Sequence, residues 1–245
     1  LSDHRVRQVN YDEIYPNKEL AYGETGVLNV LNMAFYPQER GPYNVDSEGM
    51  GRDGRLLNPE KRWGSMMRAM DVTNFENANY EYIEFWLMDP AITSQWADDH
   101  SIAYEGGDLY FNLGEISEDI LKDGLKSFEN GLDVNEDTTY TATTVWGRVA
   151  QRTSTVYAFD NTSPSHKTQD VGLDGLKDDD ERNFGTYSNY VELVKEKVDP
   201  AVVSQWMSDP FSPVNDPAGD NYHYYRGSDW DEQNKSILER YKHYT

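Results

Sequence analysis

The sequence predicts a mainly β protein with short helices (α+β): a β-sandwich of jelly-roll or galactose-binding-like type with helical and irregular additions. The first indication is residues 82–88, which carry bulky side chains on both faces of an extended strand. The second is a set of further segments rich in threonine, valine and aromatic residues. The third is that the helical patterns are short, so we expect small helices over the edges of the sheets.

The predicted strands begin after Gly26, where a long apolar run extends as far as Pro37, which ends it. Residues 80–88 are expected to form an inner strand, because both of its faces carry large side chains that need protein contacts. The predicted strands are 27–36, 80–88, 108–113, 139–151 and 155–159.

Capping residues and apolar spacing predict four helices. Ser117 is expected to cap the first of them, and Asp199 and Pro200 to open the third as cap and first helical residue. Pro59, after Asn58, is expected to start a short helical turn. The predicted helices are 117–128, 187–198, 200–207 and 236–241.

The character of the sequence changes after Asp160, where it becomes polar and acidic and contains glycine. We therefore predict two parts. Residues 1–160 form the β-sandwich core, and residues 161–245 contribute an acidic loop, short helices and an aromatic tail that packs on that core.

Composition excludes several classes of partner. The net charge of −22 repels phosphate backbones and anionic head groups, so neither nucleic acid nor an anionic membrane is expected as a partner. The chain has no cysteine, and no apolar run of about 18 residues predicts a transmembrane helix. It begins at Leu1 without a signal peptide, and we expect it to be a segment of a longer protein.

An acidic stretch matches part of a calcium-loop template. Aspartate, aspartate, glycine and glutamate stand at template positions 1, 5, 6 and 12, whereas Gly172 and Lys177 depart from the pattern. The alternative is a solvated acidic turn. The predicted ligands are the side chains of Asp170, Asp174, Asp178 and Glu181 and the carbonyl of Leu176.

Aromatic residues gather in the C-terminal tail, where they predict a sugar-stacking platform or a protein interface. Packing of the tail against the core is the alternative. The residues are Tyr222, Tyr224, Tyr225 and Trp230.

No constellation of catalytic residues is evident. The five histidines are scattered, and no glycine-flanked serine elbow accompanies them. The many carboxylates make chance pairs inevitable, and none is marked as a general acid beside a base. A non-enzymatic protein is therefore predicted.

Seven blocks, in order along the chain, resemble one family. They are 36–44 (YPQERGPYN), 57–64 (LNPEKRWG), 82–90 (YIEFWLMDP), 107–114 (GDLYFNLG), 169–176 (QDVGLDGL), 219–227 (GDNYHYYRG) and 236–241 (SILERY). Through these blocks the chain resembles the SprA/Sov family of very large bacterial surface proteins.

The resemblance implies that the parent protein is the outer-membrane translocon for type IX secretion in Bacteroidetes, required for the export of folded proteins and, in gliding species, of the surface adhesins used in motility. We predict that the chain is a soluble, non-enzymatic module of it. The resemblance implies a location in the cell envelope, at the outer membrane, on the periplasmic or the cell-surface side. It also implies partners: the rest of the translocon chain, a PorV-like shuttle, a plug protein and secreted cargo. The alternative function is a carbohydrate-binding β-sandwich module of a surface protein.

Overall fold

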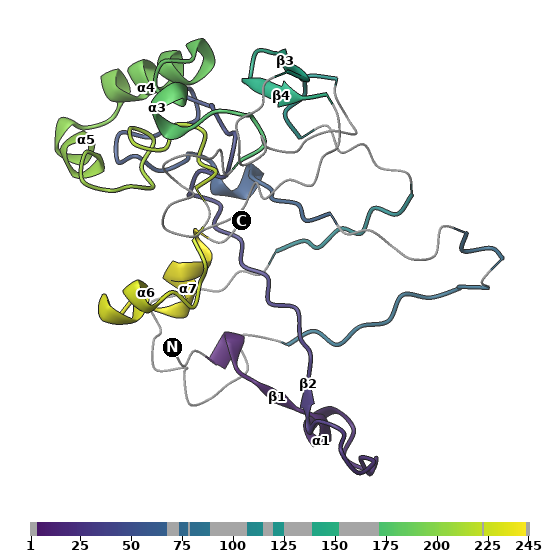
Figure 1. The fold of residues 1–245 in the computed structure, drawn as a ribbon. Coiled ribbons are helices and arrows are strands. Elements are labelled where there is room, and N and C mark those ends of the chain that lie inside the picture. Colours follow the sequence, from purple (N-terminus) through teal and green to yellow (C-terminus); the bar gives the residue numbers. More distant parts are fainter. Residues whose placement is uncertain are drawn as a thin grey trace. The chain divides into compact units, whose positions relative to one another are not determined.

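A computed structural model describes residues 4–67, 74–77, 79–88, 107–114, 120–124, 139–151, 172–221 and 223–243 (Figure 1). The α-helices are α1 (Tyr11–Ile14), α3 (Asp178–Glu181), α4 (Gly185–Lys197), α5 (Pro200–Trp206), α6 (Ser228–Glu232) and α7 (Ile237–Tyr241), with short 3₁₀ helices at His4–Val6 and Pro59–Lys61. The strands are β1 (Val9–Asn10), β2 (Val27–Leu28), β3 (Thr141–Thr143) and β4 (Arg148–Ala150).

The predicted β-sandwich is wrong. Helices make up 25% and strands only 6% of the described residues, so sheets do not build this fold. β1 pairs with β2 and β3 with β4, each as an antiparallel two-stranded sheet, and the described residues contain no sandwich of packed sheets.

The error begins with residues 80–88, where the predicted inner strand is not a strand and pairs with no other segment that the structure describes. Its large side chains are exposed, Trp86 to 72% and Phe85 to 53% of their surface. Residues 108–113 are likewise outside any strand. Aromatic and β-branched side chains favour an extended backbone locally, but a ladder needs a second segment at the right place, and local composition does not supply it.

Two of the remaining predicted strands contain only short paired stretches of two or three residues. The apolar run 27–36 forms strand only at β2, and the segment 139–151 folds into the β3–β4 hairpin in place of one strand. The strand predicted at 155–159 lies outside the described residues.

The helix predictions near the C-terminus are confirmed. α4 and α5 cover the two predicted between 187 and 207, and Asp199 Oδ1 caps α5 by accepting a hydrogen bond from the Ala201 amide at 2.9 Å. α7 matches the prediction for 236–241, with Ser236 and Glu239 forming a capping box. Of the helix predicted at 117–128, the structure describes only residues 120–124, which are not helical.

The chain forms two compact units. The first comprises Leu1–Met33 and Met66–Ile116, and the second Ala34–Ser65 and Ser117–Thr245. The predicted boundary at 160/161 lies outside the described residues, so that division stays a prediction. The first unit contains the β1–β2 pair and α1, where Glu13 accepts a hydrogen bond from the Asn10 amide at 3.0 Å.

The second unit has an apolar core built from distant parts of the chain. Its larger cluster is centred on the buried face of α4, which packs against the segment around Met50 and Leu56 and against residues of α5. The cluster comprises Met50, Leu56, Tyr190, Val191, Val194 and Val198. A second cluster, of Leu176, Tyr187 and Ala218, lies where the acidic segment meets the loop after α5.

Hydrogen bonds join residues 36–58 to the C-terminal part of the second unit. Arg40 donates to the carbonyls of Pro217 at 2.5 Å and Asp216 at 2.7 Å, and the Tyr43 amide donates to the Ala218 carbonyl at 2.7 Å. The Tyr36 hydroxyl donates to the Leu238 carbonyl. These contacts satisfy backbone groups that a buried loop leaves without water.

Among the described residues, none of the helices combines the length and the apolar character needed to cross a lipid bilayer.

Candidate functional site

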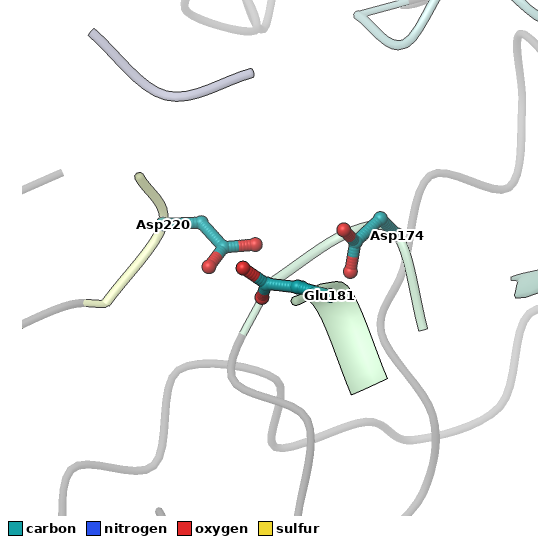
Figure 2. Close-up of side chains that lie close together, drawn as sticks. All are labelled: Asp174, Glu181 and Asp220. Atoms are coloured by element: carbon teal, nitrogen blue, oxygen red, sulfur yellow. The ribbon is translucent and has the colours of Figure 1, made fainter. Parts of the chain in front are cut away.

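The sharpest chemical feature of the described chain is a cluster of carboxylates in the second unit. Oxygen atoms of Asp174, Glu181 and Asp220 lie within 4.8 Å of one another, and those of Asp178, Glu181 and Asp216 meet the same limit. Glu181 therefore belongs to both groups. Figure 2 shows the carboxylates of the first group converging from three separate segments of the chain. We call the five residues the acidic cluster.

Local structure places these side chains. Asp174 lies in the bend that precedes α3, where its Oδ1 accepts a hydrogen bond from the Leu176 amide at 3.0 Å. Asp178 and Glu181 are the first and last residues of α3. Glu181 also holds the loop after α5, because its Oε2 accepts a hydrogen bond from the Ala218 amide at 2.8 Å.

Asp216 shapes the turn that carries Asp220. Its Oδ1 accepts a hydrogen bond from the Gly219 amide at 2.7 Å, and the amides of Asp220 and Asn221 donate to its two carboxylate oxygens at 3.3 and 3.4 Å. Asp220 Oδ2 in turn accepts a hydrogen bond from the Tyr43 hydroxyl at 2.8 Å. That hydroxyl also accepts one from the Leu173 amide at 2.6 Å.

Two glycines permit this close approach. A Cβ atom on Gly172 would collide with Asp220 Oδ2, and one on Gly175 would collide with the carbonyl oxygen of Arg148. Gly175 also has a φ of +70°, which side chains with a Cβ rarely adopt. The acidic bend is thereby pressed against β4 on one side and the Asp220 turn on the other.

Burial dominates the electrostatics of the cluster. Asp174, Glu181, Asp216 and Asp220 are all exposed to 4% or less. Burial raises the pKa of Glu181 well above its usual value, and the negative charges of Asp220, Asp174 and Asp216 raise it further. Burial also raises the pKa of Asp178 to about 6, with a further contribution from the charge of Asp216.

The predicted metal ligands agree with this cluster in part. Asp174 and Asp178 each lie close to Glu181, but in separate groups, and Asp170 lies outside the described residues. The side chain of Leu176 lies in the second apolar cluster. The 12-residue calcium loop as such stays a prediction.

Sequence reasoning missed Asp216 and Asp220. They stand in a turn-rich stretch with proline, glycine and asparagine, which indicates a loop but gives no sign that the loop returns to α3. It also missed Tyr187 and Tyr43, which line the same region.

The predicted aromatic surface is divided between exposed and buried positions. Tyr224 is 41% exposed and Tyr225 is half-buried, whereas Trp230 is only 5% exposed. Tyr222 lies outside the described residues. A binding role for these four residues stays a prediction.

Trp230 belongs to a packed aromatic cluster at the end of the chain. The ring of Phe211 stacks on His243 with centroids 3.9 Å apart, and Trp230 lies 4.4 Å from His223 and 5.9 Å from His243. Burial lowers the pKa of His243 to about 4. This arrangement joins α6 and α7 to the loop after α5.

Comparison with known proteins identifies one part of the chain. Residues 189–245, which hold most of α4 and all of α5, α6 and α7, match the SprA_N family model, described as a motility related/secretion protein. This confirms the resemblance for that stretch of the sequence. Neither the curated proteins nor the solved structures gave a match.

Proposed function

We propose, from the SprA_N match over residues 189–245, that this chain is a non-enzymatic module of a SprA-like secretion and motility protein. Its work is scaffolding: it presents an extramembrane surface to the rest of the translocon chain. We propose a location in the cell envelope, at the outer membrane, on its periplasmic or cell-surface side. The match to a motility and secretion family is the single observation that carries this proposal.

The packing of the second unit supports a module larger than the matched stretch. The buried face of α4 is completed by Met50 and Leu56, and Arg40 and Tyr43 bind the loop at 216–218. Residues 36–58 and 172–188 therefore belong to the same body as residues 189–243. A body held by so many buried contacts suits a structural role.

The first unit offers a surface for the rest of the translocon chain. Its extended residues 82–88 and 107–114 expose aromatic and aliphatic side chains, among them Tyr82, Trp86 and Leu87. Burial of exposed apolar surface against protein is favourable, with a free-energy gain of about 25 cal/mol for each Å² removed from water. Further proposed partners are a PorV-like shuttle, a plug protein and secreted cargo.

Deletion of the matched stretch tests the proposal. Removing the codons for residues 189–245 from the parent gene should abolish export of secreted proteins into the medium and, in a gliding species, colony spreading. Immunoblotting of the parent protein in the outer-membrane fraction controls for its abundance. Normal export and spreading with the shortened protein present at the usual level would refute the proposal.

Substitutions in the first unit test the proposed contact with the parent chain. Trp86→Ser with Leu87→Ser should lower export, because the exposed apolar side chains would no longer be buried against their partner. Tyr22→Ser is the matched control, since Tyr22 is fully exposed and lies outside the extended apolar segments. Equal export by both variants would exclude residues 82–88 as the contact.

No observation on the described residues favours the alternative of a carbohydrate-binding module. The sandwich on which it depended is contradicted, and the tryptophan of the predicted platform is buried.

A further inference from the structure

The acidic cluster brings five carboxylates together in the second unit. Asp174, Glu181, Asp216 and Asp220 are buried, and Asp178 is partly buried beside them. Moving an ionised carboxylate out of water costs several kcal/mol even after the protein relaxes. Such a group is therefore paired with a cation, coordinates a metal or takes up a proton.

The nearby arginines act on the edge of the cluster. Arg40 donates to the carbonyls of Asp216 and Pro217, and its charge lowers the pKa of Asp216 against the effect of burial. Arg182 pairs with Asp179 and has a similar effect on Asp178. For Glu181, in contrast, the strongest neighbouring charges are the negative ones of Asp220, Asp174 and Asp216.

A second, independent feature points to a ligand between the carboxylates. Tyr187 is fully buried, and its hydroxyl makes no hydrogen bond within the described part of the chain. Asp174 is the acidic group with the strongest effect on it, followed by Asp220 and Glu181. Leaving a buried hydroxyl without a partner is unfavourable, so a polar occupant beside it would stabilise the folded chain.

We propose that Asp174, Glu181 and Asp220 bind a calcium ion. All three offer carboxylate oxygens, the donors that hard divalent cations prefer, and the two groups of the acidic cluster contain neither histidine nor cysteine. Zinc favours nitrogen and sulfur ligands, and magnesium keeps several of its waters. Calcium accepts irregular sets of oxygen ligands, which suits side chains from a bend, a helix end and a loop.

The first group is chosen over the second because all three of its carboxylates are buried and all three act on the buried Tyr187 hydroxyl, whereas Asp178 of the second group is only partly buried. Both carboxylate oxygens of Asp216 already accept hydrogen bonds from backbone amides of the 216–221 turn. Asp178 Oδ1 accepts one from the Asn221 side chain at 3.0 Å. We assign Asp216 and Asp178, whose hydrogen bonds hold the 216–221 turn, to shaping that turn, and Asp174, Glu181 and Asp220 to the ion.

The ion would tie two parts of the second unit together. Asp174 lies in the bend before α3 and Glu181 is the last residue of α3, whereas Asp220 belongs to the loop after α5. Calcium thereby becomes a structural cross-link of the body that contains the SprA_N stretch. This assignment depends on the geometry of the second unit and is independent of the proposed role in secretion.

The test uses the full chain after removal of divalent ions with a chelator. Isothermal titration with CaCl₂ at constant ionic strength should show saturable binding tighter than about 10⁻³ M, the weak limit for calcium modules. The midpoint temperature of thermal unfolding should rise when CaCl₂ is added and return to its starting value with EGTA, because an ion that binds only the folded chain stabilises it. MgCl₂ should give the smaller shift.

Two variants with the same change in charge locate the site. Asp220→Asn should weaken calcium binding at least about tenfold, since losses at residues that only support a ligand already reach that size. It should leave the calcium-free protein at least as stable, which shows that the variant folds. Asp179→Asn is the control, because Asp179 lies in α3 next to Asp178 but is almost fully exposed.

Two results would overturn the assignment. One is a flat titration of the wild-type chain together with an unfolding temperature that CaCl₂ does not change. The other is an equal calcium response in Asp220→Asn and Asp179→Asn, which would indicate general screening of the net charge of −22.

Discussion

At the scale of single residues, the close packing of acidic and aromatic side chains determines which substitutions this protein tolerates. The acidic bend fits against Asp220 only because residue 172 has no side chain. The terminal aromatic cluster holds a half-buried histidine that burial keeps neutral. Each arrangement gives a measurable expectation.

Gly172→Ala is expected to destabilise the protein by about 1–3 kcal/mol, because its methyl group would collide with the Asp220 carboxylate and press on the Tyr43 hydroxyl, 2.7 Å away. Urea unfolding measures the loss. Gly185→Ala is the matched control, since nothing lies within 4 Å of its added Cβ and alanine favours the helix that begins there. Equal stability of the two variants would show that the bend has room for a side chain.

His243 should make stability depend on mild acid. Its pKa is about 4 in the folded chain and about 6.5 in the unfolded one, so from pH 6.5 down to 4 only the unfolded state gains the proton. Stability therefore falls over that window, by about 1–2 kcal/mol once partial exposure is allowed for. The charged groups that also act on the ring are Asp209, Lys242, Lys235 and His223.

His243→Phe isolates this contribution, because the new ring keeps the stack on Phe211 and cannot titrate. Urea unfolding from pH 7 to pH 4 should show a smaller loss for the variant than for the wild type. Parallel pH profiles would mean that His243 is equally basic in both states.

At the scale of elements, α4 organises the second unit through one face. Val194 is fully buried in the larger apolar cluster, whereas its neighbour Leu193 is 50% exposed. A short link joins α4 to α5, and Asp199 in that link caps the start of α5. The amphipathic spacing that predicted α4 is the pattern that places Val191, Val194 and Val198 together.

Val194→Ala is expected to lower the free energy of unfolding by about 2 kcal/mol, from the loss of buried methyl groups and the cavity they leave. Leu193→Ala removes more atoms but should change it by less than about 0.5 kcal/mol, because that side chain faces water. Chemical denaturation monitored by circular dichroism compares them. A larger loss from Leu193→Ala would reverse the assignment of the buried face.

At the scale of the whole molecule, the SprA_N stretch does not contain its own core. Met50 and Leu56 complete the cluster around α4, and Leu176 and Tyr187 complete the one beside Ala218. The loop at 216–218 is bound by Arg40 and Tyr43 through backbone carbonyls. Segments on both sides of the first unit's residues thus build one body.

A peptide of residues 189–245 alone should therefore unfold without a cooperative transition, since it lacks the partners of its apolar face. A chain that joins 34–65 to 117–245 through a flexible linker should regain a sigmoidal thermal transition in circular dichroism. A cooperative transition of the short peptide would show that the family-matched region folds by itself.

Local sequence information predicted α4, α5 and α7 because a helix is held by contacts within a few residues. The sequence therefore indicates directly that Asp199 and Ser236 cap helices and that the valines of α4 mark its buried face. The same reasoning failed for residues 80–88, since aromatic content favours an extended chain and says nothing about which segment pairs with it.

The acidic cluster shows the same division. The sequence by itself marked Asp174, Asp178 and Glu181, which lie close together along the chain, and it identified the family resemblance later confirmed for residues 189–245. Only the tertiary structure brought Asp216 and Asp220 to them, because the loop after α5 returns through bonds to Arg40, Tyr43 and Glu181. Contacts between distant segments depend on how the whole chain packs, and no local pattern encodes them.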